Sequence, residues 1–447
     1  MSFESIVDGV RDRVVPDEAE IGALEAAVDE LEASARSAIA DLPVAAETRL
    51  VGSTARGTWL SGDRDIDLFV LFSPDIDRSE LERYGLEVGH TVLPDGHEEF
   101  AEHPYVKGQH HGFDVDCVPC YAVDDASEIR SAVDRTPFHT TYLADRIDPV
   151  ADEVRVAKAF LSANGIYGSD LRTRGFSGFL TELLVLEYGG FREFVEAAAD
   201  WEPPVRLDPA GHGDRSFDDP LVVVDPTDPG RNVAAVCSAR SVARAIHYAR
   251  RLSADPRPEL FERRAPEPLS AAEIRRRIEE RGTAPIAIRF PTPDIVDDQL
   301  YPQLEKSLDG IEGTLSRAGF DPIRGACFAA EESVLLVECA VGELPAVVRH
   351  EGPPVGVREH AEGFYRSYTG ESVVGPYVDD RGRYVVERAR TARTPEDHVE
   401  AKLFDVALGA HVESALEAEY ETLTGGELGA LSEPFGAELA EYFDPGP

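Results

Sequence analysis

Apolar positions recur at helical or at strand spacing along the chain, and the changes between the two spacings divide it into regions. The first region combines helical spacing with short apolar runs bounded by turn residues. It predicts two helices and three strands: residues 2–14 and 17–41, then 45–52, 66–72 and 114–123. Strands mixed with flanking helices predict an α/β or α+β domain over residues 1–142.

The middle of the chain, residues 143–256, has a mainly helical pattern. Within it, residues 174–190 begin with small residues and end in two glycines, which predicts a buried helix. Residues 202–230 are rich in proline, aspartate and glycine, and we expect them to form a long surface connection. This middle region is therefore predicted to be a helical central domain.

The last region, residues 257–447, begins within a proline-broken linker near residues 255–268. Its pattern predicts a strand, a long helix and two strands within residues 284–340, which is half of a ferredoxin-like or RNA-recognition-type sandwich. A hairpin over residues 377–389 follows, and helices close the chain. The whole pattern predicts a multidomain α+β protein.

Charge is the unusual feature of the composition. The net charge is −41, from 85 acidic residues against 44 basic ones, and the acidic residues are spread through segments with folding patterns. Such self-repulsion is tolerable where salt screens it, because the Debye length at 1 M salt is about 3 Å. We therefore expect a halophilic source, and the acidity does not exclude RNA as a partner. No apolar run approaches the roughly 18 residues of a membrane span, and the expected location is cytoplasmic.

Two aspartate pairs carry the candidate chemistry. Asp65 and Asp67 lie two residues apart on a predicted strand, so both side chains point to one face. Asp114 and Asp116 form a matching pair on another strand. Two carboxylates about 4 Å apart repel each other, whereas a divalent cation reverses the sign of the interaction and oxygen ligands suit Mg²⁺. The alternative is that such pairs cap loops or lie on solvated strand faces.

A glycine–serine turn precedes the first pair by about twelve residues. Gly52 and Ser53 end a predicted strand, and a short helix predicted over residues 54–60 would present free backbone N–H groups to an anion. The Ser53 hydroxyl and the Arg56 guanidinium can add hydrogen bonds to a phosphate. A phosphate site beside a metal-binding pair is the arrangement that a nucleotidyltransferase requires.

Residues 51–70 resemble the Gly-Ser…Asp-x-Asp signature of the DNA polymerase β-type nucleotidyltransferase superfamily. Four further stretches resemble one branch of it, the archaeal (class I) CCA-adding enzymes: residues 114–121, 131–140, 155–185 and 223–235. The resemblance covers residues 45–235 and continues more loosely through the C-terminal third. It implies a polymerase β-type head, a helical central domain and a C-terminal tRNA-binding domain.

The resemblance also implies roles for particular residues. Asp65, Asp67 and Asp116 would be the catalytic carboxylates that bind Mg²⁺, with Asp116 preferred over Asp114 because it precedes an x-x-Pro-x-Tyr motif. The first carboxylate is often glutamate in relatives, so Asp65 is a mild departure. The residues implied to bind ATP or CTP are Ser53, Arg56, His139, Lys158 and Tyr167.

The residues themselves leave alternatives for three of these assignments. Lys158 shares a helix face with apolar residues, where it can also be a stem that extends its amine to solvent. Tyr167 can stack on a base or simply pack, and His139 can be a structural histidine. Arg231 is a further candidate for a contact with the nucleotide.

The activity implied by the resemblance is template-independent addition of C, C and A to the 3′ end of tRNA, from CTP and ATP. The implied partners are these nucleotides and the 3′ end and acceptor/T arm of tRNA, with no membrane; a homodimer stays open. Eleven arginines lie in residues 240–281, either to hold the tRNA backbone or to pair with glutamates on helix surfaces. The rival functions are a poly(A) polymerase or antibiotic nucleotidyltransferase, and an inactive RNA-binding protein on the same fold.

Overall fold

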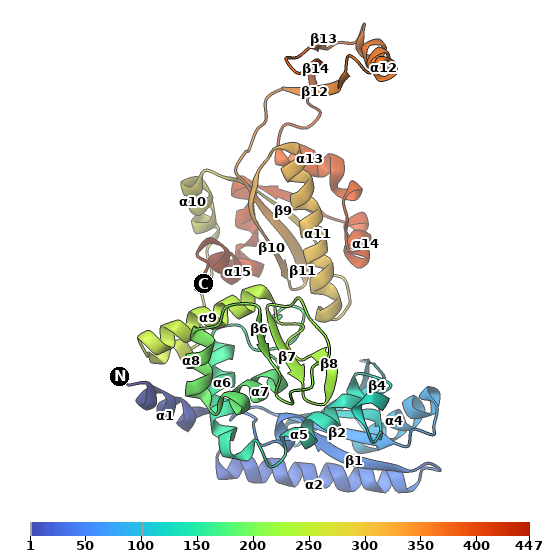
Figure 1. Ribbon diagram of the computed structural model, residues 1–447, viewed down its shortest axis with the longest axis vertical. Coiled ribbons are helices and arrows are strands. Elements are labelled where there is room, and N and C mark those ends of the chain that lie inside the picture. Colours follow the sequence, from blue (N-terminus) through green and yellow to red (C-terminus); the bar gives the residue numbers. More distant parts are fainter. Residues whose placement is uncertain (1, 101) are drawn as a thin grey trace. The chain divides into compact units, whose positions relative to one another are not determined.

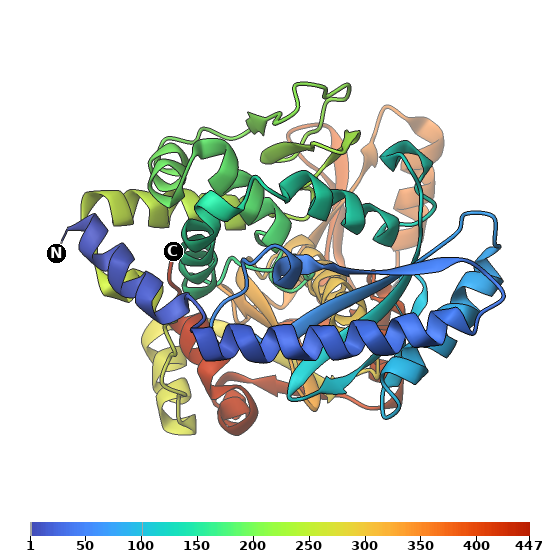
Figure 2. The same ribbon diagram turned by 90° about the horizontal axis from the view of Figure 1, so that it is seen from below.

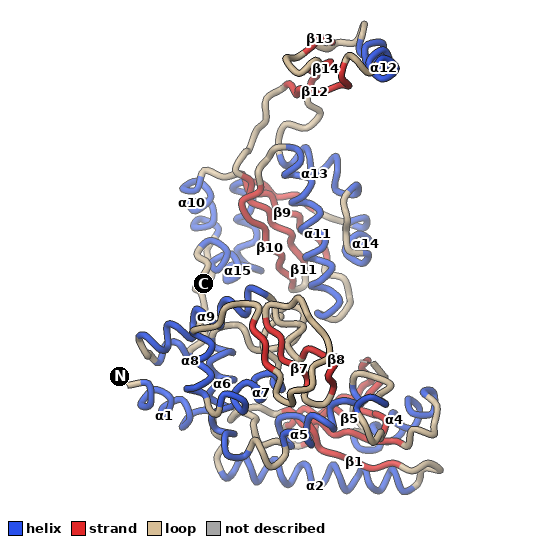
Figure 3. Tube along the Cα trace, viewed as in Figure 1, coloured by secondary structure: helices blue, strands red, loops and turns tan. Residues whose placement is uncertain are grey.

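A computed structural model describes residues 2–100 and 102–447. The chain forms two compact units, one that ends at Arg264 and one that spans Ala265–Gly446, and each is described by itself (Figures 1 and 3). The principal elements of the first unit are α1 (Phe3–Val14), α2 (Glu18–Ala40), β1 (Ala46–Val51), α3 (Gly52–Ala55), β2 (Asp65–Phe72), α4 (Arg78–Val92), β3 (His97–Phe100), β4 (Pro104–His110), β5 (Phe113–Tyr121), α5 (Thr136–Leu143), α6 (Ala151–Ala163), α7 (Gly178–Tyr188), α8 (Phe191–Ala199), β6 (Val205–Leu207), β7 (Leu221–Asp225), β8 (Asp228–Asn232) and α9 (Ala239–Ala254).

A five-stranded sheet with the order β1-β2-β5-β4-β3 forms the first part of this unit. β2 and β5 are parallel, and the other neighbours are antiparallel. Helices α2 and α4 cover one face, where alternate residues of β2 and β5 join their apolar side chains in one core cluster. Figure 2 shows α2 running along the sheet. The intervening residues of β2 and β5 point to the opposite face, and these residues include the aspartate pairs.

The short helix after β1 differs from its prediction. The expected helix covered residues 54–60, but α3 begins at Gly52 and ends at Ala55. Arg56 leaves the helical region, Gly57 has φ +61°, and the N–H of Thr58 donates to the Ser53 carbonyl at 3.0 Å. The positive φ ends the helix because a right-handed helix requires a negative one.

Helices α6, α7, α8 and α9 pack around a second apolar core in this unit. Ile6 and Val10 of α1 lie in the same core, although α1 precedes the sheet in the chain. α7 is buried as predicted, with the Ser177 hydroxyl at its N-terminus accepting from Leu180 N–H at 3.1 Å and left-handed Gly189 at its C-terminus. The prediction of a surface connection over residues 202–230 was wrong in part, because β7 within it is a fully buried strand.

The elements of the second unit are α10 (Ala271–Arg281), β9 (Ala284–Pro291), α11 (Asp297–Ala318), β10 (Pro322–Ala329), β11 (Glu332–Cys339), β12 (Val347–Pro354), α12 (Arg358–Tyr368), β13 (Val374–Val378), β14 (Arg383–Ala389), α13 (Pro395–Lys402), α14 (Ala410–Ala418), β15 (Glu421–Thr424), the 3₁₀ helix η6 (Gly425–Leu431) and α15 (Ser432–Phe443). The antiparallel sheet has the order β10-β11-β9-β15. The predicted order of strand, helix, strand and strand is present as β9, α11, β10 and β11, and β15 adds a fourth strand to the sheet.

Both faces of this sheet carry buried apolar side chains. α11, α13 and α14 cover one face, and α10, η6 and α15 cover the other. A small sheet of β12, β14 and β13 with α12 is inserted between β11 and β15 (Figure 1). Because the main sheet is covered on both sides, it differs from an RNA-recognition sheet that stacks bases on an open face. No helix within the described residues is long and apolar enough to cross a bilayer.

Candidate active site

The aspartate pairs lie directly opposite each other on neighbouring strands. In the parallel pairing of β2 with β5, Asp65 lies opposite Asp114, and Asp67 lies opposite Asp116. Residues that are opposite on neighbouring strands point to the same face, so the four carboxylates share one face of the sheet. We call these four residues the carboxylate cluster. The cluster is on the face away from α2 and α4. The sequence predicted each pair, and the strand order brings the pairs together.

The electrostatics of this cluster favour a bound cation. Burial, together with the charges of Asp116 and Asp65, raises the pKa of Asp67 to about 6. Burial also raises the pKa of Asp65 and, against the opposing charge of Lys107, that of Asp116. Carboxylates whose pKa is raised by burial and by each other are stabilised in their charged form by a positive partner. Their oxygen atoms are the ligand type that hard divalent cations take.

Asp114 and Asp116 have different partners on β4. The amide of Gln109 donates to Asp114 Oδ1 at 2.9 Å, whereas the Lys107 amine lies 3.5 Å from Asp116 Oδ1. Asp116 also contributes the largest neighbouring charge that acts on the pKa of Asp67. The charge of Asp116 therefore acts on Asp67 more strongly than the charge of Asp114 does. Lys107, one of the few lysines in the chain, was missed as a site residue by sequence reasoning.

Gly52 leaves room for the carboxylate of Asp67. A Cβ atom at residue 52 would lie 2.0 Å from Asp67 Oδ2, and the φ of +73° at this residue is one that glycine adopts without strain. Ser53 follows it at the start of α3 and is half-buried. The lack of a side chain at Gly52 therefore leaves space for the Asp67 carboxylate, and Ser53 is the next residue in the chain.

A second cluster combines two buried cations with one buried carboxylate. Arg56 Nε donates to Glu182 Oε2 at 2.8 Å, and Arg56 Nη1 donates to Thr140 Oγ1 at 3.3 Å. The Lys158 amine lies 3.6 Å from Glu182 Oε1 and donates to the Thr58 carbonyl at 2.9 Å. Arg56, Lys158 and Glu182 are all buried. Lys158 therefore does not extend its amine to solvent.

Tyr167 lies beside this second cluster. It forms a β-bridge with Phe176, and its hydroxyl would be 3.3 Å from a Cβ at Gly178, the first residue of α7. The Lys158 amine would be 4.0 Å from the same Cβ. Burial and the charge of Glu182 raise the pKa of Tyr167, which keeps its hydroxyl protonated. Arg56, Lys158 and Tyr167, all proposed from sequence as nucleotide contacts, therefore gather around the N-terminal part of α7.

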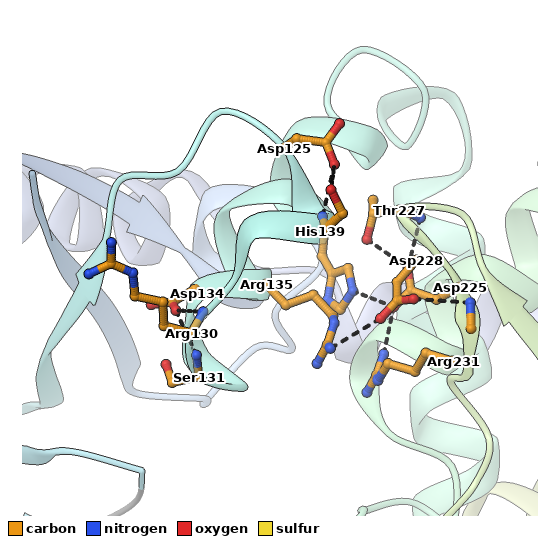
Figure 4. A network of polar contacts seen from close by, with 12 residues as sticks. Asp125, Arg130, Ser131, Asp134, Arg135, His139, Asp225, Thr227, Asp228 and Arg231 are labelled. Atoms are coloured by element: carbon orange, nitrogen blue, oxygen red, sulfur yellow. Dashed lines mark hydrogen bonds and ion pairs between the residues drawn. The ribbon is translucent and has the colours of Figure 1, made fainter. Parts of the chain in front are cut away.

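His139 is held by a separate network (Figure 4). Its Nε2 donates to Asp225 Oδ2 at 2.9 Å, and its ring stacks on Phe179 with centroids 3.8 Å apart. Asp225 also accepts from Arg231 at 2.7 Å and from the Thr227 hydroxyl at 2.8 Å. Burial raises the pKa of Asp225, but the hydrogen bond from His139 and its other donors outweigh burial and lower it.

The carboxylate cluster, the cation cluster and the His139 network are adjacent in the first unit. The Thr140 hydroxyl that accepts from Arg56 belongs to the residue after His139, and the charge of Arg56 acts to lower the pKa of Asp67. Sequence reasoning missed Glu182 and Asp225. Glu182 is an acidic residue in the middle of an apolar run of α7, and that pattern was a signal. Asp225 lies in the segment predicted to be a surface connection.

The arginine-rich stretch, residues 240–281, is divided between the two units. α9 belongs to the first unit, whereas α10 belongs to the second and covers its sheet. Arg281 of α10 makes two hydrogen bonds, of 2.6 and 2.9 Å, to the carboxylate of Glu338. Arg275 donates to the Gly426 carbonyl at 3.1 Å. Part of this stretch therefore stabilises the second unit.

Family models match three successive parts of the chain. A nucleotidyltransferase domain matches residues 34–139, the second domain of tRNA nucleotidyltransferases matches residues 152–262, and the C-terminal domain of CCA-adding enzymes matches residues 281–425. The CCA-adding enzyme of Haloarcula marismortui is 58% identical over 100% of this chain and 99% of its own length. The chain belongs to the CCA-adding enzyme family.

Other members of the CCA-adding family extend the comparison. The enzyme of Halobacterium salinarum is 55% identical over 99% of this chain and 98% of its own, and that of Methanosarcina acetivorans is 40% identical over 96% of both. Among solved structures, Escherichia coli CdnC with ATP covers 58% of this chain and 95% of its own at 20% identity, with a TM-score of 0.45. The Cid1 poly(U) polymerase covers 59% and 99% at 17% identity, with a TM-score of 0.44.

Membership of the CCA-adding family confirms several expectations from the sequence. The protein is an enzyme, a nucleotidyltransferase with a multidomain α+β fold. A nucleotidyltransferase of this family uses divalent-metal catalysis. Several relatives come from halophiles, which agrees with the charge of −41.

Proposed function

We propose that this enzyme adds and repairs the 3′-terminal CCA of tRNA from CTP and ATP, without a nucleic-acid template, with Mg²⁺ at Asp65, Asp67 and Asp116. The observation that supports the site assignment is the register of β2 with β5, which puts Asp67 opposite Asp116. Burial, followed by the charge of Asp116, raises the pKa of Asp67 to about 6. Bound Mg²⁺ would lower the pKa of the terminal ribose 3′-hydroxyl and stabilise the leaving pyrophosphate.

The residues around Glu182 are proposed to hold the triphosphate. Two basic side chains, Arg56 and Lys158, lie 2.8 and 3.6 Å from one buried carboxylate, so basic groups outnumber the acidic group at this place. A positive charge fixed in a buried site attracts phosphate oxygens at little entropic cost, because the side chains are already ordered. Ser53 beside Gly52 and the Tyr167 hydroxyl add donors to the same region.

The His139 network is proposed to contribute to base choice. The ring of His139 is fixed by Asp225 on one edge and by Phe179 on one face. Because a template strand is lacking, cytosine and adenine must be distinguished by protein groups and the RNA end together. A group that hydrogen-bonds the correct base edge loses a partner with the wrong base, which costs about 1–3 kcal/mol.

The proposed division of labour follows the predicted domains. Residues 1–142 form the catalytic head, residues 143–256 contact the nucleotide and tRNA, and residues 257–447 bind the acceptor and T arm of tRNA. We propose that the tRNA contacts of the last region lie outside its main sheet, because both faces of that sheet are packed against helices.

The function is tested with purified protein in Mg²⁺ and molar salt. We expect a tRNA that lacks CCA to gain two nucleotides with CTP alone, and a tRNA that ends in CC to gain one nucleotide with ATP. Growth should stop after the terminal A. Long adenylate tails made from ATP alone on any RNA would identify a poly(A) polymerase and reject this proposal.

A further inference from the structure

Glu30, His110 and His111 form a cluster on the other side of the head's sheet from the aspartates. Glu30 lies on α2, His110 ends β4, and His111 lies in the turn to β5. Glu30 Oε2 is 3.2 Å from His110 Nε2 and 2.9 Å from His111 Nε2. α2 packs on the face to which Phe113 and Val115 point, whereas Asp114 and Asp116 alternate to the opposite face. The cluster is therefore separate from the carboxylate site.

The turn presents both imidazoles to the same carboxylate oxygen. His110 pairs with Phe113, so His111 and Gly112 are the two central residues of a tight hairpin, and both have positive φ, of 50° and 82°. Turns with two positive φ values favour Asn or Asp followed by Gly. Successive side chains of an extended strand would point to opposite faces. The left-handed conformation of His111 instead brings the two rings together, with centroids 4.2 Å apart.

The donor atoms are spaced as the ligands of a small transition-metal ion. One ligand atom from each residue lies within 4.8 Å of the others. Zinc–nitrogen and zinc–oxygen bonds of about 2.0–2.2 Å give neighbouring tetrahedral ligands a separation of about 3.3–3.6 Å. The distance of 3.2 Å from Glu30 Oε2 to His110 Nε2 is close to this range. The distance of 2.9 Å to His111 Nε2 is shorter, so these two side chains would move slightly apart around an ion. Two imidazoles with one carboxylate select zinc-class ions over Mg²⁺.

We propose that Glu30, His110 and His111 bind a transition-metal ion of the zinc class that ties the β4–β5 hairpin to α2. Three protein ligands leave one tetrahedral position for water or chloride. The side chains of Glu30 and His111 are 60% and 62% exposed, so an ion can enter without opening the fold. The competing explanation is a surface ion pair between protonated histidines and Glu30, which needs no metal.

The test measures metal binding directly, in molar salt and excess Mg²⁺, on full-length protein stripped with a chelator. Calorimetry with Zn²⁺ and visible absorption with Co²⁺ should show a site with tetrahedral Co²⁺ bands in the unmodified protein. We expect His111→Ala to weaken Zn²⁺ at this site at least tenfold, and the double variant His110→Ala/His111→Ala to remove the site. Zn²⁺ should raise the melting temperature of the unmodified protein more than that of the double variant.

The control variant is His90→Ala/His97→Ala. It removes two imidazoles that pair with Glu98 and Glu99, each at 3.2 Å, in the same sheet region. It should keep the Co²⁺ bands and the Zn²⁺ affinity. Equal Zn²⁺ binding by the unmodified protein and the His110/His111 double variant, or a lack of tetrahedral Co²⁺ bands, would overturn the proposal and leave the ion-pair explanation. Neither result bears on CCA addition, which is measured separately.

Discussion

Glu182 accepts a hydrogen bond from Arg56 Nε at 2.8 Å, across 126 residues of the chain. Arg56 follows the Gly52–Ser53 turn, and Glu182 lies on α7 of the central helices, so this buried contact joins the two parts of the first unit. Lys158 of α6 lies near the same carboxylate. The cations that the sequence proposes as phosphate ligands are therefore positioned by a residue that the sequence analysis did not select.

Glu182→Gln tests that positioning. The substitution leaves two buried cations without a counter-charge, and breaking a buried pair costs about 3–5 kcal/mol. We expect a lower free energy of unfolding, measured by denaturant titration in molar salt. We also expect a higher KM for both CTP and ATP in the folded fraction. Glu187→Gln is the matched control on the same helix, because its pair with Arg146 is at the surface, and it should cost less than about 1 kcal/mol.

Asp116→Ala and Asp114→Ala separate the two candidates for the third metal ligand. Asp116 lies opposite Asp67, whereas Asp114 is opposite Asp65 and accepts from Gln109. Asp116→Ala should abolish nucleotide addition while the fold persists, and Asp114→Ala should retain most activity. The measurement is single-turnover addition of CMP to tRNA at saturating CTP. The reverse ranking would show that Asp114 is the ligand.

Gly52→Ala should remove activity through a steric clash. The new Cβ would lie 2.0 Å from Asp67 Oδ2, so the carboxylate must move. Gly57→Ala is the control: its φ of +61° imposes a similar backbone strain, of about 1 kcal/mol, but no heavy atom lies within 4 Å of the added Cβ. If the two variants lose activity equally, backbone strain and not displacement of Asp67 is the cause.

Asp67→Asn should stabilise the protein when divalent ions are removed. Because the folded pKa of Asp67 is raised from 3.8 to about 6, its contribution to stability is present below pH 4 and is lost as pH rises through 6. A shift of this size corresponds to roughly 2–3 kcal/mol. At pH 7.5 in a chelator, Asp67→Asn should therefore raise the free energy of unfolding. In Mg²⁺, where the unmodified enzyme is active, the same variant should be inactive. Thermal unfolding at pH 4 and pH 7.5 provides the check, since the difference should disappear at pH 4.

Salt should stabilise the folded protein. A net charge of −41 repels itself, and lowering the salt from molar to about 0.1 M lengthens the Debye length from about 3 to about 10 Å. We expect the melting temperature to fall continuously over that range. A neutral solute at the same osmolality should not prevent this fall in melting temperature, because it does not screen charge. A melting temperature that is unchanged or higher at low salt would contradict the halophilic interpretation.

The sequence predicted those features that depend on neighbours along the chain. The helical spacing of apolar residues predicted α2, and the two-residue spacing predicted that Asp65 and Asp67 lie on one face of β2. Turn chemistry predicted the Gly52–Ser53 turn, although not that α3 would end at Ala55. The prediction of a surface connection over residues 202–230 was wrong at β7, which is a short buried strand of five residues. The strand was missed because the segment around it is rich in proline, aspartate and glycine, a composition typical of surface loops.

Spatial neighbours were decided by the tertiary structure. Nothing in the local pattern states that β2 pairs with β5 in parallel, with Asp67 opposite Asp116, or that Glu182 accepts from Arg56. By itself, the sequence determined which side chains share a face, because backbone periodicity is a local property. A buried charge requires a partner of opposite charge or a hydrogen bond. Which residue becomes that partner depends on the order of the strands and the packing of the helices.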